Sequence, residues 1–375
     1  MHAARPAITR NRGENFTPIC GKPILHFRMP PSSTQRAWIA LGIILCLTGA
    51  GFGVYFYRAH RPLPGSSAGA APELLTQLPS DAPAVAYFDV AELRNSPVVL
   101  KIAALAEPQE DPEYKRFARD TGFDYTRDLD RVSLAFWPGH TAQTPLDRAV
   151  ILADGRFDRQ KIDAYMAADP SIHGGPGQVA ELPPLPGFSK REFEFVSPGR
   201  VAYTAGTEIA SSVQRGGSTR INPALEPLIH RVAGAPNFAV IRADNLPDGF
   251  YASFKSSPQL AHFARSIRGI AFAGKPDGDR LHLVLDAECD SMKNAIAIAA
   301  QLEILRMFGS AALADPHTLR QMGQQQAALA QALLNQIQVT HQDVWVRLTI
   351  DVTPEMFAWP AATPSADPPR RPAAK

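Results

Sequence analysis

Cysteine is scarce in this chain, which has three cysteines among its 375 residues. Cys20 precedes a long uncharged segment and Cys46 lies inside it, so Cys289 stands alone in the remaining sequence. A disulfide framework needs paired cysteines, and a zinc site needs Cys or His residues clustered at short spacing. Both are excluded as the basis of the fold, which must therefore depend on its hydrophobic core.

The common catalytic signatures are also missing. The sequence contains no GxSxG, SxxK, HExxH or Walker A motif, and no GxGxxG that follows a strand pattern. We therefore expect no cofactor. An enzyme with an unfamiliar site is still compatible with this absence.

Nor is there an excess of one charge, since the net charge is +2. The first 36 residues hold six basic side chains and one acid, which leaves 32 basic and 35 acidic residues in the rest of the chain. A nucleic-acid-binding surface requires a concentration of positive charge. We therefore expect no nucleic-acid partner.

Charge is absent altogether from residues 37–57, which read AWIALGIILCLTGAGFGVYFY. At 1.5 Å per residue this segment is about 31 Å long, close to the hydrocarbon thickness of a bilayer. Trp38 lies at one end and Tyr57 at the other, as is typical of membrane interfaces. A cleaved signal peptide is the alternative, but its apolar region is only about 7–15 residues long. The sequence predicts a transmembrane helix over 37–57.

The orientation follows from the basic residues before this segment, which place the N-terminus in the cytoplasm by the positive-inside rule. Met29 is an alternative start to Met1, and then Arg36 and the terminal amine would compete with Arg58 and Arg61. A short tail, one anchor and a long C-terminal part still favour the same topology. We expect a single-pass protein of the bacterial inner membrane with its C-terminal part outside the cytoplasm.

Small residues line one side of the predicted membrane helix. Gly42, Cys46, Gly49 and Gly53 are spaced by 4, 3 and 4, and the last two form a GxxxG pair. Such a face allows two membrane helices to approach closely. Self-association is one interpretation, and the general frequency of glycine in membrane helices is the other.

The rest of the chain divides by composition and by hydrophobic pattern. The predicted segments are a disordered basic N-terminal segment (1–36), a Pro/Gly/Ser/Ala linker (58–72), a first α+β repeat (73–234), a second α+β repeat (235–359) and a disordered Pro/Ala-rich tail (360–375).

Each repeat shows the element order β-α-β-β-α-β with extra helices, which is the order of a ferredoxin-like unit. Short turns between strands indicate antiparallel sheets with helices on one face, and the two sheets could join edge to edge. Ser96 and Asp158 are predicted helix N-caps. The predicted strands of the first repeat are 84–90, 132–138, 148–157, 191–196 and 200–205. Those of the second are 237–243, 269–274, 280–288, 336–341 and 343–352.

Three carboxylates precede a predicted strand and are the weak candidates for chemistry. Asp124, Asp128 and Asp130 could form a divalent-cation site or an acid–base pair. The alternative is a solvated charge cluster neutralised by Arg127 and Arg131. His282 and Asp286 share one face of another strand, but a separation of about 13 Å excludes a dyad.

Two stretches, TGFDYTRDLDRVSLAF (121–136) and AVILADGRFDRQKIDAYM (149–166), carry a resemblance to a known group of proteins. They resemble uncharacterised bacterial envelope proteins that have an N-terminal anchor and an opening similar to LPSDAPAVAYFDVAEL (78–93). The resemblance implies a bacterial, membrane-anchored envelope protein. That group has no assigned activity, so the resemblance implies no site residues.

Together these features favour a membrane-anchored extracytoplasmic binding or scaffolding protein. The alternative is an envelope hydrolase or metal-dependent enzyme built around the three aspartates. The expected partner is the lipid bilayer, through residues 37–57. A second copy of the chain or another envelope protein is a further candidate partner.

Overall fold

A computed structural model describes residues 71–105, 112–139, 146–175, 177–184, 187–213, 221–245, 258–313, 315 and 324–357. The predicted segments 1–36, 37–57 and 360–375 lie outside the described residues, as does the predicted helix face of Gly42, Cys46, Gly49 and Gly53. The first described element, α2, begins at Ala71, so it occupies the end of the predicted linker 58–72.

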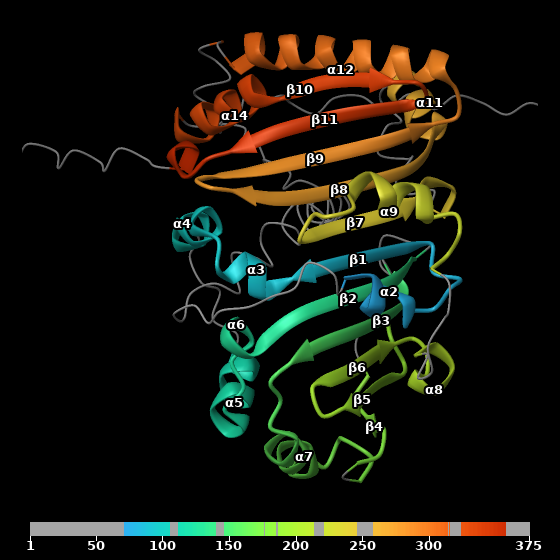
Figure 1. Ribbon diagram of the computed structural model, residues 1–375, viewed down its shortest axis with the longest axis vertical. Coiled ribbons are helices and arrows are strands. Elements are labelled where there is room, and N and C mark those ends of the chain that lie inside the picture. Colours follow the sequence, from blue (N-terminus) through green and yellow to red (C-terminus); the bar gives the residue numbers. More distant parts are fainter. Residues whose placement is uncertain are drawn as a thin grey trace, which may run out of the picture.

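One antiparallel sheet of eleven strands dominates the described structure, in the order β10-β11-β9-β8-β7-β1-β2-β3-β6-β5-β4 (Figure 1). The α+β class predicted from the sequence is confirmed. The strands are β1 Ala84–Asp89, β2 Leu129–Pro138, β3 Leu146–Gly155, β4 Ala180–Glu181, β5 Arg191–Ser197, β6 Arg200–Ala205, β7 Asn237–Arg242, β8 Ile267–Asp277, β9 Arg280–Cys289, β10 Gln338–Gln342 and β11 Trp345–Val352.

Helices connect these strands, and two of them begin at the caps expected from the sequence. The Asp158 carboxylate accepts a hydrogen bond from the Lys161 amide (3.2 Å), and the Ser96 hydroxyl lies 3.4 Å from the Val99 amide. The helices are α2 Ala71–Thr76, α3 Val90–Arg94, α4 Pro97–Leu105, α5 Pro112–Thr121, α6 Tyr125–Asp128, α7 Arg159–Ala167, α8 Ile209–Ser212, α9 Glu226–Val232, α11 Pro258–Ser266, α12 Met292–Leu313 and α14 Gln324–Gln336. Two 3-10 turns are η1 Ala243–Asn245 and η2 Pro354–Phe357.

The expected ferredoxin-like arrangement is wrong at the level of strand pairing. A split βαβ unit keeps its first two strands parallel, with another strand between them. Here β1 and β2 are direct antiparallel neighbours, with Ala84 opposite Phe136. β7 and β8 pair in the same way, with Asn237 opposite Gly274. The helices between these strands return the chain to the adjacent position instead of crossing over.

The two halves of the sheet meet where β1 pairs with β7, and they have the same pairing order outward from this junction. The first half runs β1-β2-β3-β6-β5 and the second runs β7-β8-β9-β11-β10. Each half also has a register shift at the same place in this order, between Leu129 and Arg131 on β2 and between Ile267 and Gly269 on β8. Edge-to-edge joining of two sheets therefore describes the topology.

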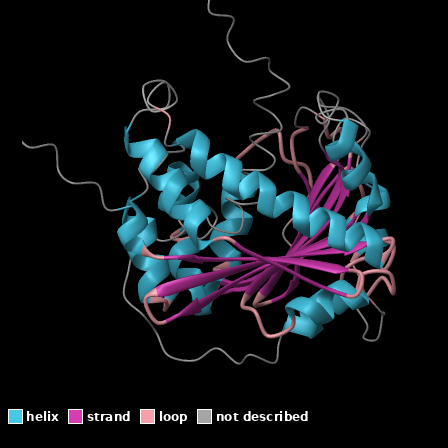
Figure 2. Cartoon of the chain, turned by 90° about the horizontal axis from the view of Figure 1, so that it is seen from above, coloured by secondary structure: helices cyan, strands magenta, loops and turns pink. Residues whose placement is uncertain are grey.

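The sheet has two different faces, and most helices gather on one of them (Figure 2). That face is covered by α3, α5, α6 and α7 in the first half and by α4, α11, α12 and α14 in the second. On the opposite face, α2 and α9 cover the strands around the junction, and leucines of both helices enter a core shared by the two halves.

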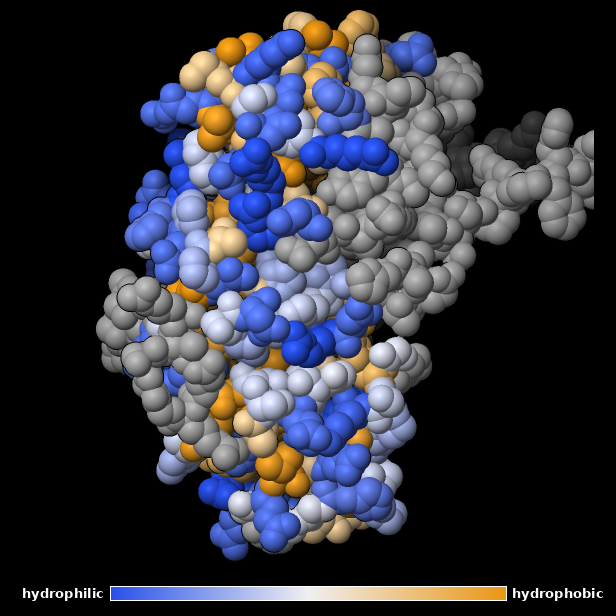
Figure 3. Space-filling view, turned by 90° about the vertical axis from the view of Figure 1, so that its right-hand side faces the viewer, coloured by the Kyte–Doolittle hydropathy of each residue, from blue (hydrophilic) through white to orange (hydrophobic). Residues whose placement is uncertain are grey.

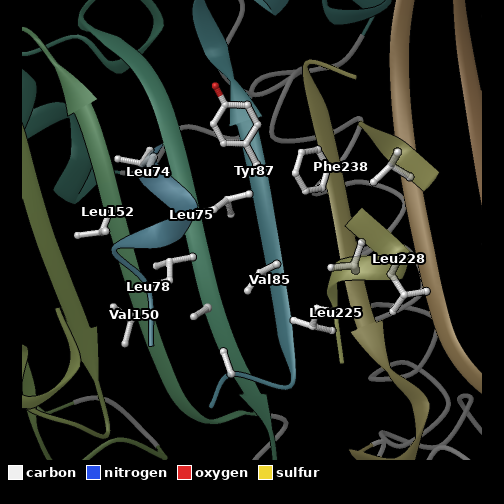
Figure 4. Close-up of a cluster of buried hydrophobic side chains, with 14 of the residues drawn as sticks. Leu74, Leu75, Leu78, Val85, Tyr87, Val150, Leu152, Leu225, Leu228 and Phe238 are labelled. Atoms are coloured by element: carbon white, nitrogen blue, oxygen red, sulfur yellow. The ribbon is translucent and has the colours of Figure 1, made fainter. Parts of the chain in front are cut away.

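Figure 4 shows this shared core around Leu75, Tyr87, Leu228 and Phe238. The rings of Tyr87 on β1 and Phe238 on β7 are 5.7 Å apart across the junction. A pair of buried aromatic rings at this separation adds about 1 kcal/mol beyond the burial of its area. The two halves are thus joined by packed side chains as well as by strand pairing.

Candidate functional site

The three predicted aspartates lie around the short helix α6 and the start of β2. Asp124 is the N-cap of α6, and its carboxylate accepts hydrogen bonds from the Thr126 amide (2.9 Å) and the Thr126 hydroxyl (2.6 Å). This use of an aspartate is local and structural, because it satisfies an amide group that the helix leaves unpaired.

Asp128 is buried and held by its neighbour in sequence. Arg127 donates from Nε to Oδ1 (2.8 Å) and from Nη2 to Oδ2 (2.6 Å), and the Asp124 amide donates to Oδ2 (3.0 Å). Burial alone would raise the pKa of Asp128, but these hydrogen bonds outweigh it and hold the pKa below its usual value. A general acid needs the opposite shift.

Asp130 points to different partners, lying 3.8 Å from the guanidinium groups of both Arg94 and Arg156. The structure therefore brings Asp124 and Asp128 together through a backbone hydrogen bond and gives Asp130 separate cationic neighbours. Across the described ranges, no group of three or more His, Cys, Asp or Glu residues could hold a metal ion.

A row of alternating charges, not anticipated from the sequence, crosses four neighbouring strands of the first half. Asp89 on β1, Arg131 on β2, Asp154 on β3 and Arg200 on β6 are successive cross-strand partners. The strongest contact is bidentate: Arg200 donates from Nε and Nη2 to the two oxygens of Asp154, at 2.6 and 2.9 Å. This hydrogen bond raises the pKa of Arg200. Strand register, which the sequence does not give, brings these residues together.

Asp89 is the last residue of this row and lies on β1, the strand that pairs with the second half. Its carboxylate is 3% exposed and accepts a hydrogen bond from the Glu92 amide (2.8 Å) as the N-cap of α3. Burial raises the pKa of Asp89 in spite of this hydrogen bond and the nearby Arg131. Burial also raises the pKa of Tyr87, two residues earlier on the same face.

The second half holds a separate buried carboxylate, Asp286, which is fully buried. Arg347, directly opposite on β11, donates from Nε to Oδ1 and from Nη2 to Oδ2, both at 2.7 Å. Arg231 of α9 donates to Oδ2 at 3.2 Å, and its guanidinium lies 4.7 Å from the ring centre of Trp345. The hydrogen bond to Asp286 raises the pKa of Arg347.

His282 lies on the same strand face as Asp286 and has its own partner. Its Nδ1 is 2.7 Å from Oδ1 of Asp351, the residue opposite it on β11. His282 and Asp286, the two polar residues considered from the sequence, are thus each paired with a residue of the neighbouring strand β11. The ion pairs described in both halves hold strands and helices together.

The surface that sequence reasoning missed is the outer side of α12. This helix lies at one end of the long axis of the molecule (Figure 1), and hydrophobic side chains gather along that end (Figure 3). Among the described residues, α12 is the one helix long and apolar enough to cross a membrane by length and composition. Its exposed large side chains are Met292, Ile296, Ile304, Leu305, Met307 and Phe308.

The inner side of α12 packs against the sheet. Ala295, Ile298 and Ala299 are buried in a cluster with Cys289 of β9 and Val346 of β11. A helix that is apolar on both sides normally lies inside a protein or a membrane. The apolar composition of α12 was the signal, but strand pairing decides which side of the helix is left uncovered.

No family model and no curated protein matches this chain. Among solved structures, crystal forms I, IV and III of TP0453 are similar to it. Their TM-scores are 0.39, 0.41 and 0.40, with 12%, 11% and 10% sequence identity. The similar region covers 75% of this chain and 93–94% of TP0453. At these values the likeness supports no inference about function.

Proposed function

We propose that this protein is a membrane-anchored extracytoplasmic binding or scaffolding protein whose working surface is the outer face of α12. One observation carries the proposal: a 22-residue helix exposes Ile304 and Phe308 to solvent while its other side is packed on the sheet. The largest exposed apolar patch of a soluble monomer, typically about 300–600 Å², is often a functional surface.

The free energy that would be gained by removing these exposed side chains from water supports a binding role. Each Å² of apolar surface removed from water contributes about 25 cal/mol. Phe308 is 69% exposed and Met307 is 57% exposed, so contact with another apolar surface would be favourable without any change in the helix. The acidic cluster offers no comparable feature, because its carboxylates are occupied by caps and arginines.

The uncharged residues 37–57 supply the proposed anchor, and their length fits one crossing of the inner membrane. The matching strand order of the two halves supports the proposal that the body arose by internal duplication. In this proposal the anchor fixes the location, and the duplicated sheet is the rigid support that presents α12.

Protease treatment of spheroplasts that express the full chain tests the proposed location. We expect digestion of the region 71–357 from outside, with the N-terminal segment protected. Spheroplasts opened with detergent are the control, since there the protease reaches every segment. Protection of the 71–357 region in intact spheroplasts, followed by its loss after opening, would place it in the cytoplasm and reject the proposal.

A further inference from the structure

We propose that the outer face of α12 binds the surface of a lipid bilayer, the same bilayer that holds the anchor. This inference rests on the proposed anchoring and adds the chemistry of the partner. The helix would lie on the membrane, parallel to its plane, and would not cross it.

The outer face is a continuous apolar stripe. Apart from the adjacent pair Met307 and Phe308, its exposed apolar residues are spaced by three or four along the helix. They are Met292, Ile296, Ala300, Ile304, Met307, Phe308 and Ala311, and the exposed Lys293 lies beside the first of them. From first to last they extend about 28 Å at 1.5 Å per residue. Glu303 and Arg306, which flank this stripe, pair with each other at 2.9 Å, so the stripe carries no unbalanced charge in its middle.

The inner face prevents α12 from acting as a membrane span. Ala295, Ile298 and Ala299 are buried against the sheet, and a crossing would pull them away from Val346 and Cys289. An interfacial helix instead inserts one apolar side about 5–10 Å into the boundary between headgroups and acyl chains. The exposed half of α12 provides the side chains for this insertion.

The size of the stripe favours a bilayer over a second copy of the chain. A helix of 22 residues is about 33 Å long and about 10 Å wide, so its outer face offers roughly 330 Å². A stable protein–protein interface buries about 800 Å² on each partner. A bilayer has no such minimum when the protein is already tethered to it, because the tether keeps the local concentration high.

The tether is long enough for this contact. α2 packs on β2, and six inter-strand steps of about 4.8 Å separate β2 from β10 beside α12, roughly 29 Å. The residues 58–70 between the predicted anchor and α2 can span up to about 45 Å when extended. The end of the molecule formed by α12 can therefore reach the membrane that holds residues 37–57.

Depth-dependent fluorescence quenching tests the contact. The full chain, with Cys20→Ser and Cys46→Ala, is placed in vesicles of phosphatidylethanolamine and phosphatidylglycerol that contain nitroxide-labelled lipid. One variant carries an environment-sensitive dye at Phe308→Cys. The matched control carries the dye at Leu100→Cys on α4, an exposed leucine of another helix. Cys289 is buried and is left in place.

The expected result is a blue-shifted emission at position 308 and quenching by the nitroxide lipid several-fold stronger than at position 100. Equal quenching at the two positions would overturn the proposal. So would a disulfide between two 308 cysteines in the unlabelled Phe308→Cys variant together with weak quenching in the labelled one, because the face would then belong to a second copy of the chain.

Alkaline carbonate extraction of the same vesicles examines the anchor separately. Release of the chain would reject the proposed anchor, whatever the quenching shows. Retention of the chain with an unquenched dye at 308 would reject only the lipid contact of α12. Because the fluorescence is read before extraction, the two results are independent.

Discussion

Asp286 and Arg347 face each other across β9 and β11 through two hydrogen bonds of 2.7 Å, although the carboxylate is completely buried. Bidentate contacts of this kind are the strongest hydrogen bonds between side chains. The pair need not make the fold more stable than apolar residues would at the same positions, because both charged groups lose their hydration on burial. Their importance is that neither partner can be removed alone.

Replacing Arg347 by Met is expected to lower the free energy of unfolding by about 3 kcal/mol, because a buried carboxylate loses its main partner. Arg231 at 3.2 Å keeps the loss from being larger. Urea denaturation followed by circular dichroism measures the effect. Arg280→Met is the control, since Arg280 is exposed at the start of the same strand. Equal losses in the two variants would contradict a special role for the pair.

Replacing the buried N-cap Asp89 by Asn should be tolerated better than replacing it by Ala. Asp89→Asn preserves the side-chain oxygen that caps α3, whereas Asp89→Ala removes it at a loss of about 1 kcal/mol. The raised pKa means that the folded state binds a proton more readily than the unfolded state. Stability from this residue therefore falls as pH rises from about 4 through the folded pKa. Denaturation curves across this range should show a weaker decline in Asp89→Asn, and an unchanged slope would argue against the assignment.

Stability should depend on pH in the opposite direction at Asp128. Arg127 and the Asp124 amide lower the pKa of this residue, although burial acts to raise it. Its contribution is complete above the ordinary pKa of about 4 and is lost as pH falls through the folded pKa. Asp128→Asn should lower stability by about 2 kcal/mol at neutral pH and by less in strong acid. Asp279→Asn, which removes an exposed carboxylate, is the control.

Two isoleucines of α12 provide a direct comparison of its two sides. Ile298 is 6% exposed and Ile296 is 46% exposed. Ile298→Ala should lower the free energy of unfolding by about 3 kcal/mol, because it leaves a cavity against the sheet. Ile296→Ala should change it by less than about 0.5 kcal/mol. Comparable losses, measured by urea denaturation in detergent, would mean that the outer face is also part of a packed core.

Two glycines with positive φ should differ in their tolerance of alanine. At Gly278 (φ 59°), a Cβ would have no neighbour within 4 Å, so only backbone strain of about 1 kcal/mol is expected. At Gly206 (φ 74°), a Cβ would overlap the backbone carbonyl oxygen of Asp147. Gly206→Ala should therefore lower the melting temperature clearly more than Gly278→Ala. The reverse order would contradict the close approach at Gly206.

Local features of the fold were predictable from the sequence. The predicted strand 280–288 matches β9 Arg280–Cys289 within one residue, and Asp158 was correctly identified as a cap. Small shifts separate other expectations from the structure. The predicted strand 269–274, for example, is the middle of the longer strand β8 Ile267–Asp277. Each of these features depends on residues a few positions apart.

Strand order was not predictable in the same way, because hydrophobic period identifies a strand but not its neighbour. The same element order fits a connection that crosses over to a parallel strand and one that returns to the adjacent antiparallel strand. The structure has the adjacent antiparallel strand. The pair Asp286–Arg347 depends on that order, as does the exposure of Phe308. The acidic cluster, in contrast, is formed by residues close in sequence. Asp128 pairs with the adjacent Arg127, as its sequence suggests, whereas Asp130 lies near Arg94 and Arg156, which the sequence does not place beside it.

The junction of β1 and β7 has a consequence for the chain as a whole. Every residue of β1 is buried, and its pairing with β7 and the Tyr87–Phe238 contact are formed between parts of the chain about 150 residues apart. If the backbone were cut near Gly234, each fragment would carry one open strand edge shaped for the other. Open edges of this kind recruit any matching strand. Two fragments produced in the same cell should therefore recombine into one sheet, and either fragment alone should form assemblies with its own copies.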